Sequence, residues 1–150
     1  QYVSTAEAGD PCIFCAKHAA RNDEDNQIVF RGSRNFVLLN RFPYTSGHLM
    51  VAPYEHVATL PEASEDTVVE LALLVREASR HLASIYRPRG INLGMNVGEC
   101  AGAGVAGHIH MHVLPRWPGD ASFMTVVGET RVLPEDLRET YRKLHQAFRG

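Results

Sequence analysis

The sequence predicts one α+β domain with a largely antiparallel sheet. Three apolar segments separated by short turns come first, one long helical pattern follows, and further strand patterns precede a last helical pattern. Strands joined by short turns pair antiparallel, and strands that are grouped rather than alternating with helices are typical of α+β proteins. At 150 residues, the chain is long enough for one domain to bury a core without disulfide support.

The first three strands are predicted at residues 28–31, 36–40 and 48–53. Gly32 and Ser33 separate the first pair, and the segment 43–47 separates the second. Glycine, proline and serine between apolar runs favour turns, so we expect these strands to form hairpins.

The long helix is predicted to begin after Ser64, which can act as its N-cap, and to end before Pro88. Glu65 and Asp66 place negative charge in the first turn, where the helix dipole favours it. Apolar residues then recur at helical spacing, namely Val68, Leu71, Ala72, Val75, Ala78, Leu82 and Ile85.

The second half of the chain returns to strands. They are predicted at residues 91–97, around the histidines that follow, and at residues 122–127, with a glycine-rich segment at 98–107. Pro134 can open a last helix. Its apolar stripe consists of Leu137, Tyr141, Leu144 and Phe148.

Three histidines at alternate positions, His108, His110 and His112, are separated by the apolar residues Ile109 and Met111. This alternation predicts a half-buried strand with the imidazoles on one face, roughly 6 to 7 Å apart. Imidazole titrates near neutrality and acts as a nucleophile, acid, base or metal ligand. The row therefore indicates a functional site rather than histidines satisfied by neighbouring backbone. A three-histidine catalytic zinc site is the other alternative, but neighbours on one strand rarely converge on one ion.

The net charge and the lengths of the apolar stretches limit the kinds of partner that we expect for this protein. A formal net charge of −2 argues against a nucleic-acid binder, which usually carries a basic face. No apolar stretch approaches the roughly 18 residues of a membrane span. We expect a soluble, cytoplasmic protein whose partner is a small molecule or a second copy of the chain.

Several blocks in a fixed order carry a family resemblance. Gly47-His48, Asn96 and the run from His108 to Val113 resemble the histidine triad (HIT) superfamily of nucleotide hydrolases and transferases. The segments 39–44 and 115–123 are similar to the branch that includes bacterial diadenosine tetraphosphate phosphorylases. The resemblance implies a single HIT domain over residues 1–150, with a C-terminal helix and with its sheet extended across a homodimer. Pairing of that kind removes a sheet edge.

The resemblance also implies a mechanism. His110 would attack the α-phosphorus of a nucleotide and form a nucleotidyl-enzyme, His112 would contact the phosphates and the leaving group, and His48 would support the imidazoles from the neighbouring strand. Phe30 and Leu39 either border a base pocket or pack in the core.

Substrate contacts are implied at five further positions. Asn40 would hold the ribose and Asn96 the phosphate, since amides donate and accept hydrogen bonds. The glycine-rich loop brings backbone amides close to phosphate oxygens. Many family members carry serine, threonine or glutamine where this chain has Gly104, followed by Val105, so the acceptor that resolves the intermediate stays open. Trp117 would stack on a base or fill the subunit contact.

Cys12 and Cys15 have the spacing with which two thiolates bind one zinc ion, and they supply half a site within the N-terminal segment 1–26. The resemblance completes a structural zinc site with His56 and His108. A redox pair, or reduced cysteines without a role, are the alternatives. Cys100 is expected to be an unpaired thiol, and surface positions are expected for His18, His81 and His145.

The expected function is cleavage of dinucleoside polyphosphates, of the diadenosine tetraphosphate type, by hydrolysis or phosphorolysis. The alternatives are a nucleoside phosphoramidate hydrolase and a nucleotide-binding sensor or interaction module with little turnover.

Overall fold

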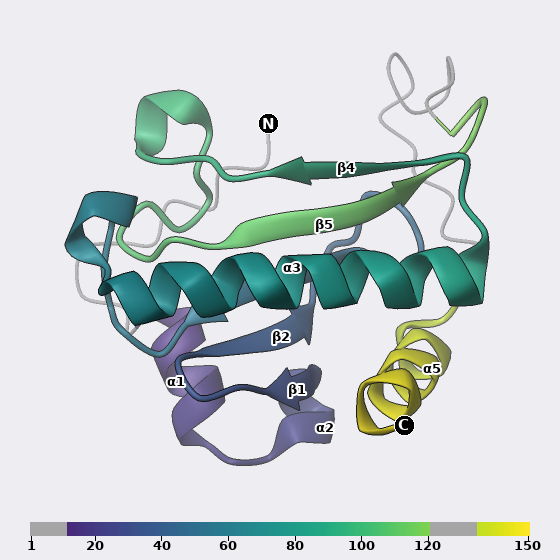
Figure 1. Cartoon of the computed structure of the whole chain (residues 1–150), viewed down its shortest axis with the longest axis horizontal. Helices are drawn as coiled ribbons and strands as arrows, with labels where there is room; N and C mark the ends of the chain where they lie inside the picture. Colours follow the sequence, from purple (N-terminus) through teal and green to yellow (C-terminus); the bar gives the residue numbers. More distant parts are fainter. Residues whose placement is uncertain (1–11, 121–134) are drawn as a thin grey trace.

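A computed structural model describes residues 12–120 and 135–150 of the chain. Its five-stranded sheet has the order β1-β2-β3-β5-β4, and every neighbouring pair is antiparallel (Figure 1). The strands are β1 (Ile28–Arg31), β2 (Asn35–Leu39), β3 (Leu49–Pro53), β4 (Gly90–Gly94) and β5 (Met111–Arg116). The predicted α+β class and antiparallel sheet are confirmed.

One face of the sheet is covered by α3 (Glu65–Tyr86) and α5 (Leu137–Arg149), as Figure 1 shows. Alternate residues of the central strands, such as Val37, Val51 and Val113, are fully buried and pack with apolar residues of α3. Leu39 and Phe30 belong to this packing too, which favours the core role over a base pocket. Each fully buried side chain of this kind contributes roughly 1.5–3 kcal/mol.

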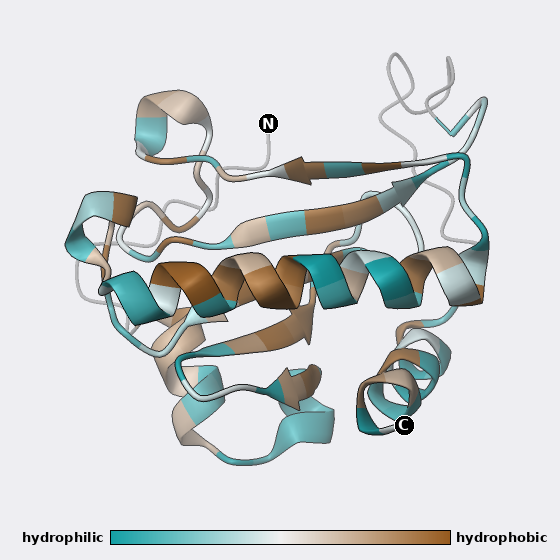
Figure 2. Cartoon of the chain, in the orientation of Figure 1, coloured by the Kyte–Doolittle hydropathy of each residue, from teal (hydrophilic) through white to brown (hydrophobic). Residues whose placement is uncertain are grey.

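The opposite face carries a second cluster formed by Ile28, Phe36, Leu38, Met50 and Ala52. It packs against α1 (Ile13–Ala19), whose Phe14 is 1% exposed. The hydropathy colours of Figure 2 show β2 and the first half of α3 as mostly apolar, and the second half of α3 as mixed with polar residues. The histidine row faces the side of the sheet on which Phe14 lies, because His112 pairs with Met50 in the register of β3 and β5.

The long helix begins and ends where the sequence predicts. The Ser64 side chain accepts a hydrogen bond from the backbone N–H of Thr67. At the other end, Arg87 adopts a left-handed conformation with φ of 46°, and its N–H donates to the carbonyl of Ala83. Pro88 then disfavours continuation of the helix.

Some boundaries differ from the prediction. β5 begins at Met111, so His108 and His110 precede it, because the N–H of Ile109 donates to Val57 rather than to β3. β4 ends at Gly94 instead of residue 97, since its pairing with β5 ends at the Gly94–His112 pair. Short elements that were not predicted are α1, α2 (Asp23–Asn26), η1 (Leu60–Glu62) and η2 (Glu99–Ala101).

The last helix is confirmed, with its N-cap at Asp136, whose side chain accepts from the N–H of Arg138. Its predicted opening at Pro134 and the predicted strand at 122–127 lie outside the described residues. Among the residues that the structure describes, no helix has the length and apolar character needed to cross a membrane.

Candidate functional site

His48 and His112 form a hydrogen-bonded pair across β3 and β5. His48 lies just before β3 and is 1% exposed, and its Nε2 is 2.9 Å from Nδ1 of His112. The backbone N–H of Tyr44 donates to Nδ1 of His48 over 3.2 Å. In neutral His48 the proton is therefore on Nε2, which donates to His112. His112 in turn keeps its own proton on Nε2.

His110 is oriented by its neighbour in the row. Its Nδ1–H donates to the backbone carbonyl of His108 over 2.9 Å, which leaves Nε2 with a free lone pair. The rings of His110 and His112 lie 5.0 Å apart, so both imidazoles belong to one site. His110 is 5% exposed.

Burial keeps both imidazoles neutral. Desolvation lowers the pKa of His110, and the hydrogen bond to the His108 carbonyl opposes this shift. Desolvation, together with the repulsion that a protonated His110 would exert, lowers the pKa of His112 to about 4. At neutral pH, His110 therefore presents an unprotonated Nε2, which is the form that acts as a nucleophile.

Four donor groups gather where α1 meets the histidine row. His108 donates its Nε2–H to the carbonyl of Pro53, so its Nδ1 lone pair faces Cys12 and Cys15, with sulfur distances of 3.3 and 3.7 Å. Nδ1 of His56 lies 3.4 Å from the sulfur of Cys15. All four donor atoms lie within 4.8 Å of one another.

The chemistry and spacing of this set fit a metal ion. Tetrahedral zinc, with bonds of about 2.3 Å to sulfur and about 2.0 Å to nitrogen, requires sulfur and nitrogen donors about 3.6 Å apart. Burial and the neighbouring Cys12 thiol raise the pKa of Cys15, as expected for two thiols brought together without a cation. The predicted grouping of Cys12, Cys15, His56 and His108 is thus present in the structure.

Asn40 lies beside His48. Its Oδ1 accepts from the N–H of Phe42 at 3.0 Å, and its Nδ2 is 3.5 Å from Nδ1 of His48. The segment from Asn40 to Gly47 therefore wraps around the His48 imidazole, and Tyr44 stacks on it with a ring distance of 5.0 Å.

The glycine-rich loop folds back on itself. Asn96 is exposed and donates to the carbonyl of Gly102 over 3.2 Å. Gly98 and Gly102 have φ of +84° and +85°, a region that favours glycine. Gly104 has open space at the position of a Cβ, and Val105 packs against the cluster that contains Phe14.

Trp117 is not brought to the histidines of its own chain. It follows the last residue of β5, and the six residues of that strand separate it from His110, a span of about 23 Å over seven residue steps. Its backbone N–H donates to Asp120.

The remaining histidines are less exposed than predicted. The surface position expected for His81 is wrong, because its ring is buried between α3 and α5, 4.5 Å from Phe148. His18 is half-buried against Phe36 and Tyr54, and His145 is half-buried and bonded to the carbonyl of Val29. Cys100 is an exposed free thiol, as predicted.

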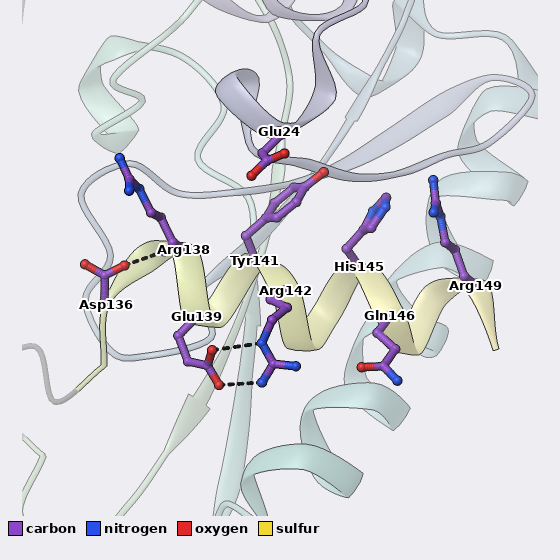
Figure 3. A pocket seen from close by; sticks show the side chains of 9 residues that line it. All are labelled: Glu24, Asp136, Arg138, Glu139, Tyr141, Arg142, His145, Gln146 and Arg149. Atoms are coloured by element: carbon purple, nitrogen blue, oxygen red, sulfur yellow. Dashed lines mark hydrogen bonds and ion pairs between the residues drawn. The ribbon is translucent and has the colours of Figure 1, made fainter.

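A separate hollow of about 720 Å³ runs along α5 and contains none of the three alternating histidines. Figure 3 shows Arg138, Tyr141, His145 and Arg149 projecting from one side of this helix, with Glu24 opposite. Its lining mixes both signs of charge, and Arg142 is already paired with Glu139. It lacks the convergent donor set of the histidine site.

Sequence reasoning missed several groups at the histidine site, among them one side chain and the backbone partners of the imidazoles. Phe14 contacts the His110 ring, and a phenylalanine between two predicted metal ligands was the available signal. The carbonyl of Pro53 fixes the tautomer of His108, and no side-chain pattern indicates such a backbone group.

The sequence model of the HIT domain matches residues 21–119. The chain belongs to the HIT family. An AP-4-A phosphorylase of Mycobacterium tuberculosis is 42% identical over 123 residues, which cover 82% of this chain and 63% of that protein. An uncharacterized HIT-like protein of Saccharolobus solfataricus is 34% identical and covers 91% of this chain and 94% of its own length. The chain thus spans under two thirds of the phosphorylase.

A solved HIT structure supports the fold and bears on the metal site. A Zn-bound histidine triad family protein from Mycobacterium smegmatis superposes with a TM-score of 0.72 and 29% identity, covering 92% of this chain and 93% of that one. The predicted HIT-like fold is confirmed. The four donor groups of this chain are placed so that they could hold a metal ion, and a related HIT protein has been solved with zinc bound.

Proposed function

We propose that this HIT protein is a nucleotide hydrolase or nucleotidyltransferase that cleaves dinucleoside polyphosphates at an α-phosphate. One observation carries the proposal: the Nδ1–H of His110 is bonded to the His108 carbonyl, and its Nε2, beside His112, has no hydrogen-bond partner among the described residues. The relatives named AP-4-A phosphorylase and bis(5'-nucleosyl)-tetraphosphatase, the latter 27% identical over 97 residues, support this substrate class.

In the first step, Nε2 of His110 attacks the α-phosphorus, an N–P bond forms, and the bond from phosphorus to the bridging oxygen breaks. The leaving group is a nucleoside polyphosphate, which is stable as an anion and needs no proton. His112 donates its Nε2–H to phosphate oxygens, while His48 holds Nδ1 of His112. Positioning and charge stabilisation of this kind supply most of the catalysis of phosphoryl transfer.

In the second step, an acceptor attacks the nucleotidyl group and the N–P electrons return to His110. Water releases a nucleoside monophosphate and a proton, and inorganic phosphate releases a nucleoside diphosphate. Gly104 offers no side-chain hydrogen bond to either acceptor, so the products decide between water and phosphate.

The test is incubation with diadenosine tetraphosphate and inorganic phosphate, with AMP, ADP and ATP resolved over time. ADP with ATP indicates phosphorolysis, and AMP with ATP indicates hydrolysis. His110→Asn should abolish both reactions while nucleotide binding persists, and His145→Asn, at a half-buried histidine on α5, is the matched control. Unchanged turnover in His110→Asn would overturn the mechanism, and binding without products from the parent would favour a sensor.

We further propose that Cys12, Cys15, His56 and His108 hold a structural zinc ion. A bound ion would supply a crosslink between α1, the segment after β3 and the start of the histidine row. His108 suits this role, because its Nε2–H is bonded to Pro53 and its Nδ1 is left for the metal.

A homodimer is the third part of the proposal. β4 is an edge strand of the sheet, and Leu93 on it is 55% exposed. Val69 and Leu73 of α3 are 60% and 46% exposed, and they stand in the apolar half of the helix seen in Figure 2. A strand edge with no partner among the described strands, together with exposed apolar helix residues, favours burial against a second copy.

A further inference from the structure

Helix α1 joins the two chemical sites of the molecule. Phe14 stands between the metal-site candidates Cys12 and Cys15, and its ring lies 5.1 Å from that of His108 and 4.9 Å from that of His110. At 1% exposure, Phe14 is enclosed and offers no surface to a ligand. Its contact with His110 is therefore a contact within the protein.

The His110 ring depends on that contact. Within residues 12–120 and 135–150, its hydrogen bond is the one from Nδ1 to the His108 carbonyl, which fixes one edge of the imidazole. The plane of a histidine ring rotates in a broad well, so a hydrogen bond at one atom leaves the direction of Nε2 loosely defined. Among the described residues, the rings in contact with His110 are those of Phe14, at an interplanar angle of 37°, and His112, at 75°.

Phe14 in turn is held by the thiol and imidazole cluster. Helix α1 has seven residues and no side-chain hydrogen bond at its N-cap, and a helix this short is marginal on its own. Cys12 and Cys15 bracket Phe14 and contact His108, while apolar residues of β2 and β3 pack against the ring. The position of Phe14 is thus tied to the same groups that would hold the metal.

We propose that Phe14 is a positioning residue that holds the His110 imidazole in its attacking orientation and links it to the Cys12, Cys15, His56 and His108 cluster. This inference rests on the proposed function of His110. It predicts an effect on kcat rather than on KM, because Phe14 orients the nucleophile and does not reach the substrate. Displacement of a reacting atom by about 1 Å lowers rates by about a hundredfold.

The decisive comparison is between Phe14→Leu and Phe36→Leu. Both remove a fully buried ring from the same apolar cluster, but the ring contacts of Phe36 are with His18 and Tyr54 rather than with His110. Ile13→Leu, at the half-exposed neighbour on α1, controls for changes to the helix itself. We expect Phe14→Leu to lower kcat at least about tenfold with KM within about twofold, and the other variants to retain kcat.

A second readout is independent of turnover. In isotope-labelled histidine spectra, assigned with His110→Asn, parent His110 should show one tautomer with the proton on Nδ1, as its bond to His108 requires. Phe14→Leu, and the parent stripped of metal by a chelator, should both show a mixture. If no dinucleotide is turned over, the proposed function fails but this readout still tests the positioning. Equal kcat losses in the two leucine variants, or an unchanged tautomer in Phe14→Leu, would overturn the proposal.

Discussion

Backbone groups set which ring nitrogen carries the proton in three histidines of the site, His48, His108 and His110. The N–H of Tyr44 donates to Nδ1 of His48. The carbonyl of Pro53 accepts from Nε2 of His108, and the carbonyl of His108 accepts from Nδ1 of His110. Alternation in the sequence predicts that these residues share a face, and the structure brings them together. The alternation does not predict the tautomers of these histidines, because their backbone partners depend on the tertiary fold and not on a residue type.

The buried neutral His112 should make stability depend on pH. Its folded pKa of about 4 lies below the ordinary histidine value of 6.5, so the unfolded chain binds more protons between these two pH values. The stabilisation is complete above pH 6.5 and is lost as the pH falls towards 4. Denaturant unfolding of the parent should therefore show a falling free energy over this window.

The variant His112→Asn isolates this effect from the loss of metal at low pH. Its free energy of unfolding should fall less steeply than that of the parent between pH 6.5 and 4, since asparagine does not titrate. His145→Asn, on α5, should follow the parent curve. Parallel curves for the parent and His112→Asn would show that His112 titrates normally in the folded protein.

At the scale of elements, Glu70 anchors the turn between β1 and β2 to α3. Its carboxylate accepts from the N–H groups of Ser33, Arg34 and Asn35, each at 2.7 Å. Burial raises the pKa of Glu70, but these bonds and one from the Asn35 side chain outweigh it and lower the pKa overall.

Substitution of Glu70 should therefore destabilise the fold. Glu70→Gln keeps the shape but places an amide donor against backbone donors, and we expect a loss of about 1–3 kcal/mol in the free energy of unfolding. Glu77→Gln on the same helix removes ion pairs with Arg76 and Arg80 at the surface, where water screens them, and should leave the free energy of unfolding nearly unchanged. Urea titration distinguishes the two, and equal losses would refute the anchoring role.

The metal prediction concerns α1. Cys15→Ser should lower the zinc content, measured by elemental mass spectrometry, and should lower the thermal midpoint, because α1 loses its crosslink to the histidine row. Cys100→Ser removes an exposed thiol and is the matched control. A metal-free parent with an unchanged midpoint on zinc addition would contradict the structural role.

Elements with strong local signals were the ones that sequence predicted well. The cap at Ser64, the apolar period and the proline after Arg87 specify α3 almost to the residue. In contrast, α1 is too short for a periodic signal and is held by contacts with His108 and β2 that are far away in the sequence. The start of β5 was missed for a similar reason, because Val57 replaces β3 as the partner of Ile109.

At the scale of the whole molecule, the two faces of the sheet carry different groups of residues. One face packs on α3 and α5 and supplies stability, while the other holds the histidine row, Phe14 and the metal-site residues. The edge at β4, which pairs with no further strand in the described part of the chain, and the exposed apolar residues of α3 belong to neither set. A homodimer would give this surface a partner and would extend the sheet beyond one chain.

The proposed dimer can be tested by placing a charged side chain in its expected interface. Leu73→Glu places a carboxylate in the exposed apolar half of α3, where burial against a second copy would require its costly desolvation. We expect the mass measured by light scattering to fall from that of two chains to that of one. Ile13→Glu adds the same charge on α1, which packs on the other face of the sheet, and should remain dimeric. A dimeric Leu73→Glu would exclude this helix face as the interface, and a monomeric parent would exclude the dimer itself.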